Sequence, residues 1–206
     1  MNRPNNKTAF AATARGIAAA AATPPGSRNF DRWKTKACSL SFRDLHTAPT
    51  SPWGKRTALT SYATDIGVHY HTLATCKVTL MDERYAEYSR TTAKHYRMFT
   101  QGRVHFTVDD PLAPDNPANV ACFATAVDEQ YDILANTRKR PVTRYAALRY
   151  AQGVAASYTQ FAGVFALPAH HGVPVFAALA RMEAYLGTPA GVVLYARLAL
   201  EGHRHG

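Results

Sequence analysis

Residues 88–97 concentrate polar side chains whose types and spacing suit phosphate binding. Arg90, Lys94 and Arg97 are separated by four and three residues, so a helix would place them on one face. Thr91 and Thr92 would then lie at the start of that helix, where free backbone N–H groups attract anions. The pattern predicts a nucleic-acid-binding surface made of Arg90, Thr91, Thr92, Lys94 and Arg97. A solvated basic face with a capping threonine explains the same residues.

Three histidines are the catalytic candidates. His69 and His71 alternate along a predicted strand and would point to the same side. With His95 they could bind a metal or act as acid and base. However, no carboxylate or thiolate stands at a recognisable metal-ligand spacing, and a His-x-His pair is more often part of an exposed strand surface. We therefore expect no metal and no cofactor.

Familiar catalytic motifs are absent from the sequence. It contains no P-loop, dinucleotide-binding glycine turn, zinc-protease helix motif or hydrolase nucleophile elbow. We expect a non-enzymatic protein, and a histidine-dependent hydrolase or nuclease is the weaker alternative.

Tyrosines stand among these basic residues and have two interpretations. Aromatic rings interleaved with Arg and Lys can stack on unpaired bases. They can also form the rim of a small β core with the hydroxyl in water, which is the interpretation we favour. The tyrosines concerned are Tyr62, Tyr70, Tyr85, Tyr88 and Tyr96.

The charge balance indicates an acidic partner. The 206 residues carry 24 Lys+Arg and 14 Asp+Glu, a formal net charge of +10. Residues 1–56 contain ten of the basic and two of the acidic residues, so most of the excess lies there. Such a balance favours nucleic acid or another polyanion as partner. Residues 1–29 are predicted to be a flexible basic arm, because two consecutive prolines follow their alanine run.

The elements that position these residues are predicted to form an α+β fold. Strand-like segments lie at residues 58–63, 66–71, 73–80 and 103–108, with a short helix from Thr91 or Thr92 to about Gln101. We expect residues 30–108 to form a small α+β domain with an antiparallel sheet. A proline-rich linker, residues 109–117, follows it.

Residues 118–206 are predicted to be a helical region with a bundle of about four helices. Asn116 and Pro117 form a helix start signal, and apolar residues then recur every three to four positions. Further helices are expected at residues 143–167, 174–187 and 189–202. The last is apolar on more than one side, which indicates burial, self-association or a protein partner. A virion or assembly component is therefore the alternative function.

The three cysteines form no disulfide framework, and no window is long and apolar enough for a membrane span. We expect a cytoplasmic protein without a membrane partner, and a place in a virion remains an alternative.

Two short motifs resemble a small domain of uncharacterised phage and plasmid proteins. Ser61, Tyr62, Thr64 and Ile66 match its first motif. The second is matched by Tyr88, Ser89, Thr91, Thr92 and His95. The likeness covers about residues 55–100 and implies a mobile-element origin and a small α+β unit, without an established activity.

Overall fold

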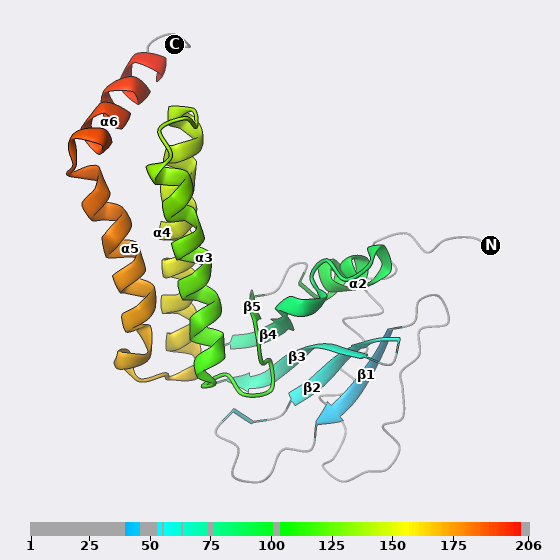
Figure 1. The fold of residues 1–206 in the computed structure, drawn as a ribbon. Helices are drawn as coiled ribbons and strands as arrows, with labels where there is room; N and C mark the ends of the chain where they lie inside the picture. The colour runs from blue at the N-terminus through cyan, green and yellow to red at the C-terminus, as the bar shows by residue number, and fades with distance from the viewer. Residues whose placement is uncertain are drawn as a thin grey trace. The chain divides into compact units, whose positions relative to one another are not determined.

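The computed structural model describes residues 40–45, 53–54, 56–62, 64–73, 76–100 and 104–202 (Figure 1). The chain divides into two compact units, residues 1–114 and 115–206. The division falls inside the proline-rich segment 109–117. The predicted basic arm, residues 1–29, and the predicted helix end at Gln101 lie outside the described residues.

The first unit contains a five-stranded sheet whose strands follow chain order. Neighbouring strands from β1 to β4 are antiparallel, whereas β5 is parallel to β4. The strands are β1 (Leu40–Leu45), β2 (Arg56–Ser61), β3 (Thr64–Leu73), β4 (Cys76–Asp82) and β5 (Val104–Val108). The α+β class is confirmed. The sheet is mixed and not purely antiparallel, because α2 (Arg90–Thr100) brings the chain back before β5 begins.

A bulge and a glycine shape the sheet face that α2 covers. The register between β2 and β3 shifts after Leu59, so Ile66 is an extra residue beside the Leu59–Gly67 pair. A Cβ on Gly67 would lie 2.7 Å from both the Leu80 carbonyl oxygen and Met81 Sδ. The buried cluster on this face contains Leu59, Ile66, Met81, Met98 and Phe99.

Hydrogen bonds fix the segment after β5 against β2 and β3. The Tyr70 hydroxyl donates to the Pro111 carbonyl at 2.7 Å, and Arg56 Nη1 donates to the Leu112 carbonyl at 3.0 Å. Tyr70 is completely buried. The first unit therefore includes the first part of the proline-rich segment, to Pro114.

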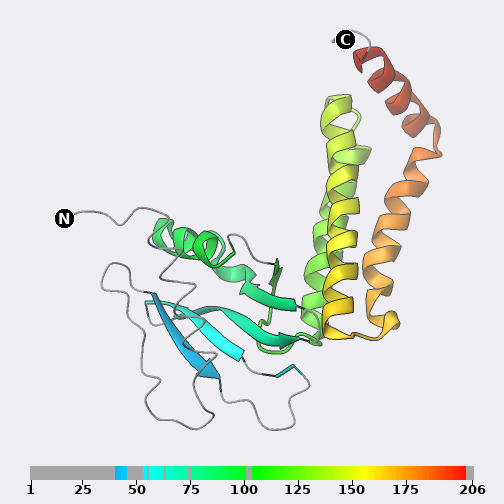
Figure 2. The ribbon, with the colours of Figure 1, turned by 180° about the vertical axis from the view of Figure 1, so that it is seen from behind.

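The second unit is helical. Its elements are α3 (Pro117–Ala135), α4 (Pro141–Phe165), the short 3-10 helix η2 (Ala169–Gly172), α5 (Val173–Leu186) and α6 (Pro189–Gly202). The four predicted α-helices are present, and α3, α4 and α5 lie side by side in both views (Figures 1 and 2). Asn116 caps α3 as predicted, since its side chain accepts from Ala118 N at 3.0 Å. None of the helices described is both long and apolar enough to cross a membrane.

A buried arginine joins the helices of the second unit. Arg144 on α4 is 3% exposed and donates to the Leu134 carbonyl, at the end of α3, at 2.7 Å. It also donates to the Tyr185 hydroxyl at 2.7 Å. The positive charge is thus placed at the negative end of α3. Aromatic contacts among Phe123, Tyr158 and Phe161 form a core between α3 and α4, about 21 Å along α4 from Arg144.

Candidate nucleic-acid interface

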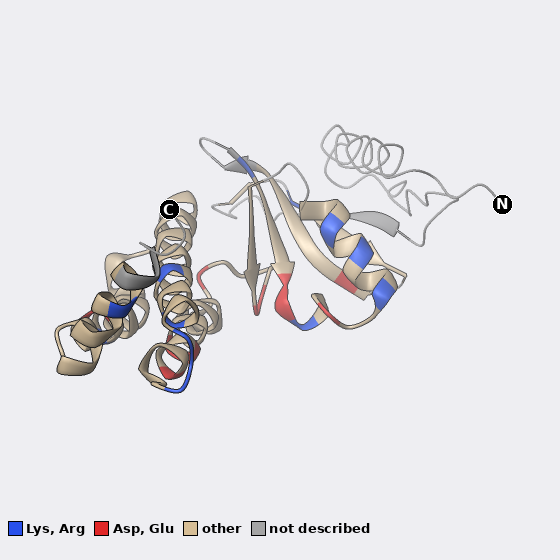
Figure 3. Ribbon diagram, turned by 90° about the horizontal axis from the view of Figure 1, so that it is seen from above, with Lys and Arg blue, Asp and Glu red and all other residues tan. Residues whose placement is uncertain are grey.

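Helix α2 has one buried and one basic face. Thr92, His95, Met98 and Phe99 are buried against the sheet. Arg90, Lys94 and Arg97 are exposed, and the basic residues follow one another along the helix (Figure 3). None of these three cations forms an ion pair within the described parts of the chain. We call the surface formed by Arg90, Thr91, Lys94 and Arg97 the basic face of α2.

The start of α2 differs from the prediction. The helix begins at Arg90, so Ser89 is its N-cap, and the predicted cap at Thr91 or Thr92 is wrong. Ser89 Oγ accepts from Thr92 N at 3.1 Å and donates to Thr92 Oγ1 at 3.0 Å. Thr92 is buried, whereas Thr91 is exposed. Of the predicted phosphate ligands, Thr92 is therefore used in the helix start.

His95 joins α2 to β2. Its Nδ1 lies 2.7 Å from Ser61 Oγ, and the residue is 1% exposed. Burial, with a smaller contribution from the Lys94 charge, lowers the pKa of His95 below its usual value. The imidazole is therefore neutral at pH 7.

His69 and His71 lie elsewhere on the sheet. His69 Nδ1 is 2.9 Å from Thr79 Oγ1, His71 Nε2 is 2.7 Å from Thr57 Oγ1, and the two rings meet edge to face with centroids 4.8 Å apart. They share one side of β3 as predicted. The expected exposed surface is wrong for His69, which is 2% exposed because β3 is the central strand.

The three histidines do not converge. Thr57 contacts His71 and Ser61 contacts His95, and these two residues are four positions apart on β2, about 13 Å. The described residues include no group of three or more His, Cys, Asp or Glu side chains that could hold a metal ion. The geometry gives no support to a site built from all three.

The tyrosines divide into two groups. Tyr70 is buried, and Tyr85 and Tyr96 pack on the core, as the favoured interpretation predicted. Tyr62 and Tyr88 are instead 61% and 75% exposed. The core interpretation is therefore wrong for these two.

The acidic side chains near the start of α2 differ in whether they are ion-paired or exposed. Asp82 accepts two hydrogen bonds from the Arg84 guanidinium, at 2.9 and 2.6 Å, and this raises the pKa of Arg84. Glu83 and Glu87 are exposed. An anion approaching α2 therefore meets the carboxylates of Glu83 and Glu87 beside the cations of the basic face.

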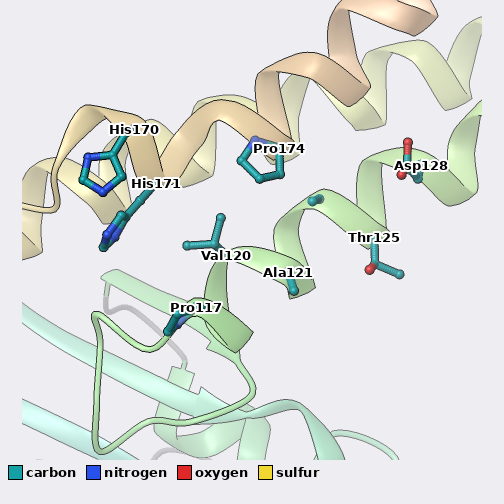
Figure 4. Close-up of a pocket in the computed structure, with 9 residues that line it drawn as sticks. Pro117, Val120, Ala121, Thr125, Asp128, His170, His171 and Pro174 are labelled. Atoms are coloured by element: carbon teal, nitrogen blue, oxygen red, sulfur yellow. The ribbon is translucent and has the colours of Figure 1, made fainter.

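A separate pocket of about 340 Å³ lies in the second unit, between α3, η2 and the start of α5 (Figure 4). Its wall is mainly apolar, with Val120, Ala121 and Pro174 among its lining residues. The imidazoles of His170 and His171 meet edge to face at 4.6 Å. The pocket is also lined by the carboxylate of Asp128, which is ion-paired with Arg181 at 2.8 Å.

Comparison with protein-family models, curated proteins and solved structures finds no significant match.

Proposed function

We propose that this protein binds nucleic acid, without catalysing a reaction on it, through the basic face of α2. The observation that carries the proposal is that three cations are exposed opposite the buried face of the helix and have no ion pair among the residues that the structure describes. Like charges at helical spacing repel one another and do not stabilise the helix. A row of phosphates would neutralise them, and each phosphate contact adds salt-sensitive affinity.

Two further features support this proposal. The excess of basic residues within residues 1–56 would add electrostatic attraction for a polyanion. The motif resemblance supports an accessory role in a phage or mobile element. Because the three candidate histidines do not converge, we do not extend the proposal to hydrolysis.

The test is nucleic-acid binding measured across a salt series. The Arg90→Ala/Lys94→Ala/Arg97→Ala variant should bind more weakly. The magnitude of its slope of log K against log[salt] should be smaller by about 2–3. Each phosphate contact releases counterions on binding, so the loss of three contacts reduces the number released. Fluorescence anisotropy with a labelled oligonucleotide measures both quantities.

A matched control removes the same charge from the turn between α3 and α4. Arg138, Lys139 and Arg140 are exposed, and replacing all three with alanine lowers the net charge from +10 to +7, as the α2 variant does. The proposal requires the α2 variant to lose much more affinity than this control. Equal losses would show that net charge alone drives binding.

A second candidate function is protein interaction or assembly. Apolar side chains are exposed on the last two helices: Val173 and Phe176 on α5, and Val192, Val193 and Tyr195 on α6. Static light scattering tests assembly, which requires a particle mass above that of one chain, and a pull-down tests interaction with a different protein. A single-chain mass at all concentrations, with no partner recovered, would contradict it.

A further inference from the structure

Tyr62 combines an unfavourable backbone conformation with an exposed side chain. It follows β2 in the turn to β3 with φ of 57°, where a bulky side chain is rare and Gly or Asn is usual. Such a conformation persists when the surroundings enforce it, and it is enriched at functional positions. Since 61% of the residue is exposed, burial of the ring does not explain its presence.

The ring of Tyr62 lies beside α2. Its centroid is 6.1 Å from that of His95, and His95 is held to the neighbouring Ser61. His95 directly follows Lys94 and lies one turn after Thr91, both on the basic face. The Tyr62 ring therefore lies on the side of α2 that carries His95, next to the edge of the basic face that Thr91 forms.

Tyr88 provides a second exposed ring. It precedes the helix cap Ser89, and its ring meets that of Tyr85 edge to face at 5.8 Å. Tyr85 packs on the core, and the Arg84 guanidinium lies 5.9 Å from the centroid of the Tyr85 ring. Tyr88 is thus supported on one side and 75% exposed overall.

The sheet topology brings both rings to one end of the first unit. Strands β2 and β4 are both antiparallel to β3, so they run in the same direction and end at the same edge. Tyr62 follows the end of β2, and Tyr88 lies between the end of β4 and the start of α2. Arg90 begins the helix two residues later.

We infer that the partner of the basic face is single-stranded nucleic acid, with unpaired bases stacking on Tyr62 and Tyr88 while phosphates contact Arg90 and Lys94. This inference rests on the proposed function and specifies its substrate class. Exposed aromatic rings interleaved with cations are how proteins bind unpaired strands without reading sequence. In a duplex the base faces are stacked on one another and unavailable to the tyrosines.

Electrostatics alone predicts the opposite preference. A duplex carries more charge per length than a single strand and gives a steeper salt dependence per contact. Preference for a single strand over a duplex of equal length therefore reports stacking, separately from the charge of the basic face.

The experiment compares binding of labelled 20-nucleotide oligothymidine, oligouridine and a 20-base-pair DNA duplex to the full chain. The variants Tyr62→Asn and Tyr88→Ala should each weaken single-strand binding by roughly 5- to 100-fold, with duplex binding little changed. The Tyr62→Phe variant keeps the ring and should bind as the wild type does. The two single strands separate DNA from RNA preference within the same chemistry.

Two controls separate stacking from loss of structure. Asn tolerates positive φ, so Tyr62→Asn should leave the thermal midpoint unchanged or higher while affinity falls. Tyr150→Asn on α4 replaces a tyrosine that is also exposed and should leave binding unchanged. Because Tyr88 is the more exposed residue, Tyr88→Ala supplies a second test with little effect on the fold.

Unchanged single-strand affinity in both Tyr62→Asn and Tyr88→Ala would overturn the inference, as would equal losses for single strand and duplex. A different result would overturn the proposed function. It is overturned if the Arg90→Ala/Lys94→Ala/Arg97→Ala variant binds both forms as the wild type does, whatever the tyrosine variants show.

Discussion

At the scale of single residues, His95 makes the stability of the first unit depend on pH. Its pKa is lowered by burial between α2 and the sheet, and Lys94 lowers it further. The ordinary pKa of about 6.5 applies to the unfolded chain. Below that pH the unfolded chain binds a proton that the folded protein does not, so stability is complete above about pH 6.5 and falls as the pH decreases.

We expect the thermal midpoint of the wild type to decrease when the pH is lowered from 7.5 to 5.5. In the His95→Gln variant this decrease should be smaller, because the titrating group is gone. Circular dichroism melts at each pH measure the difference, and the other histidines are present in both proteins. An identical pH dependence in the two proteins would show that His95 is not the group responsible.

At the scale of elements, local signals predicted the helices better than the sheet. Asn116 and Pro117 start α3 through contacts within one turn of chain, and so the sequence alone locates them. Strand β1 was missed because Leu40–Leu45 is short and includes Arg43 and Asp44, and its place depends on pairing with β2. The parallel pairing of β5 depends on the path of α2, which no local pattern specifies.

Two glycines provide a matched test of packing within these elements. Gly67 on β3 has the Leu80 carbonyl oxygen and Met81 Sδ 2.7 Å from an added Cβ, whereas Gly153 on α4 has no neighbour within 4 Å. Gly67→Ala should lower the free energy of unfolding by about 1–3 kcal/mol through overpacking. Gly153→Ala should raise it by about 0.5–1 kcal/mol, since alanine favours the helix. Chemical denaturation measures both, and a neutral Gly67→Ala would mean that the Leu80 carbonyl and Met81 both move away at little cost.

At the scale of the whole molecule, the candidate site was only partly predictable. The spacing of Arg90, Lys94 and Arg97 correctly placed them on one face, because helix periodicity is a local property. The burial of Thr92, the separation of His95 from His69 and the exposure of Tyr62 all depend on how β2, β3 and α2 meet. Exposure of an aromatic residue has no sequence signal, although Tyr62 in a tight turn is an unusual choice.

The division into two units leads to a prediction about where a ligand acts. If single-stranded nucleic acid binds the basic face of α2, it stabilises the folded state of the first unit, which contains this helix, more than that of the second. At a ligand concentration 100 times the dissociation constant the gain is about 2.7 kcal/mol. Hydrogen exchange with saturating oligothymidine should therefore slow in α2 and the strands beneath it, and much less in α3 and α4.

The Arg90→Ala/Lys94→Ala/Arg97→Ala variant is the control for this measurement, because it should lose the protection in α2 while the helical unit exchanges as before. Protection that appears mainly in α3 and α4 would place the binding surface in the second unit. The exposed cations Arg138, Lys139 and Arg140 would then be the residues to replace, since they have no ion pair within the described parts of the chain either.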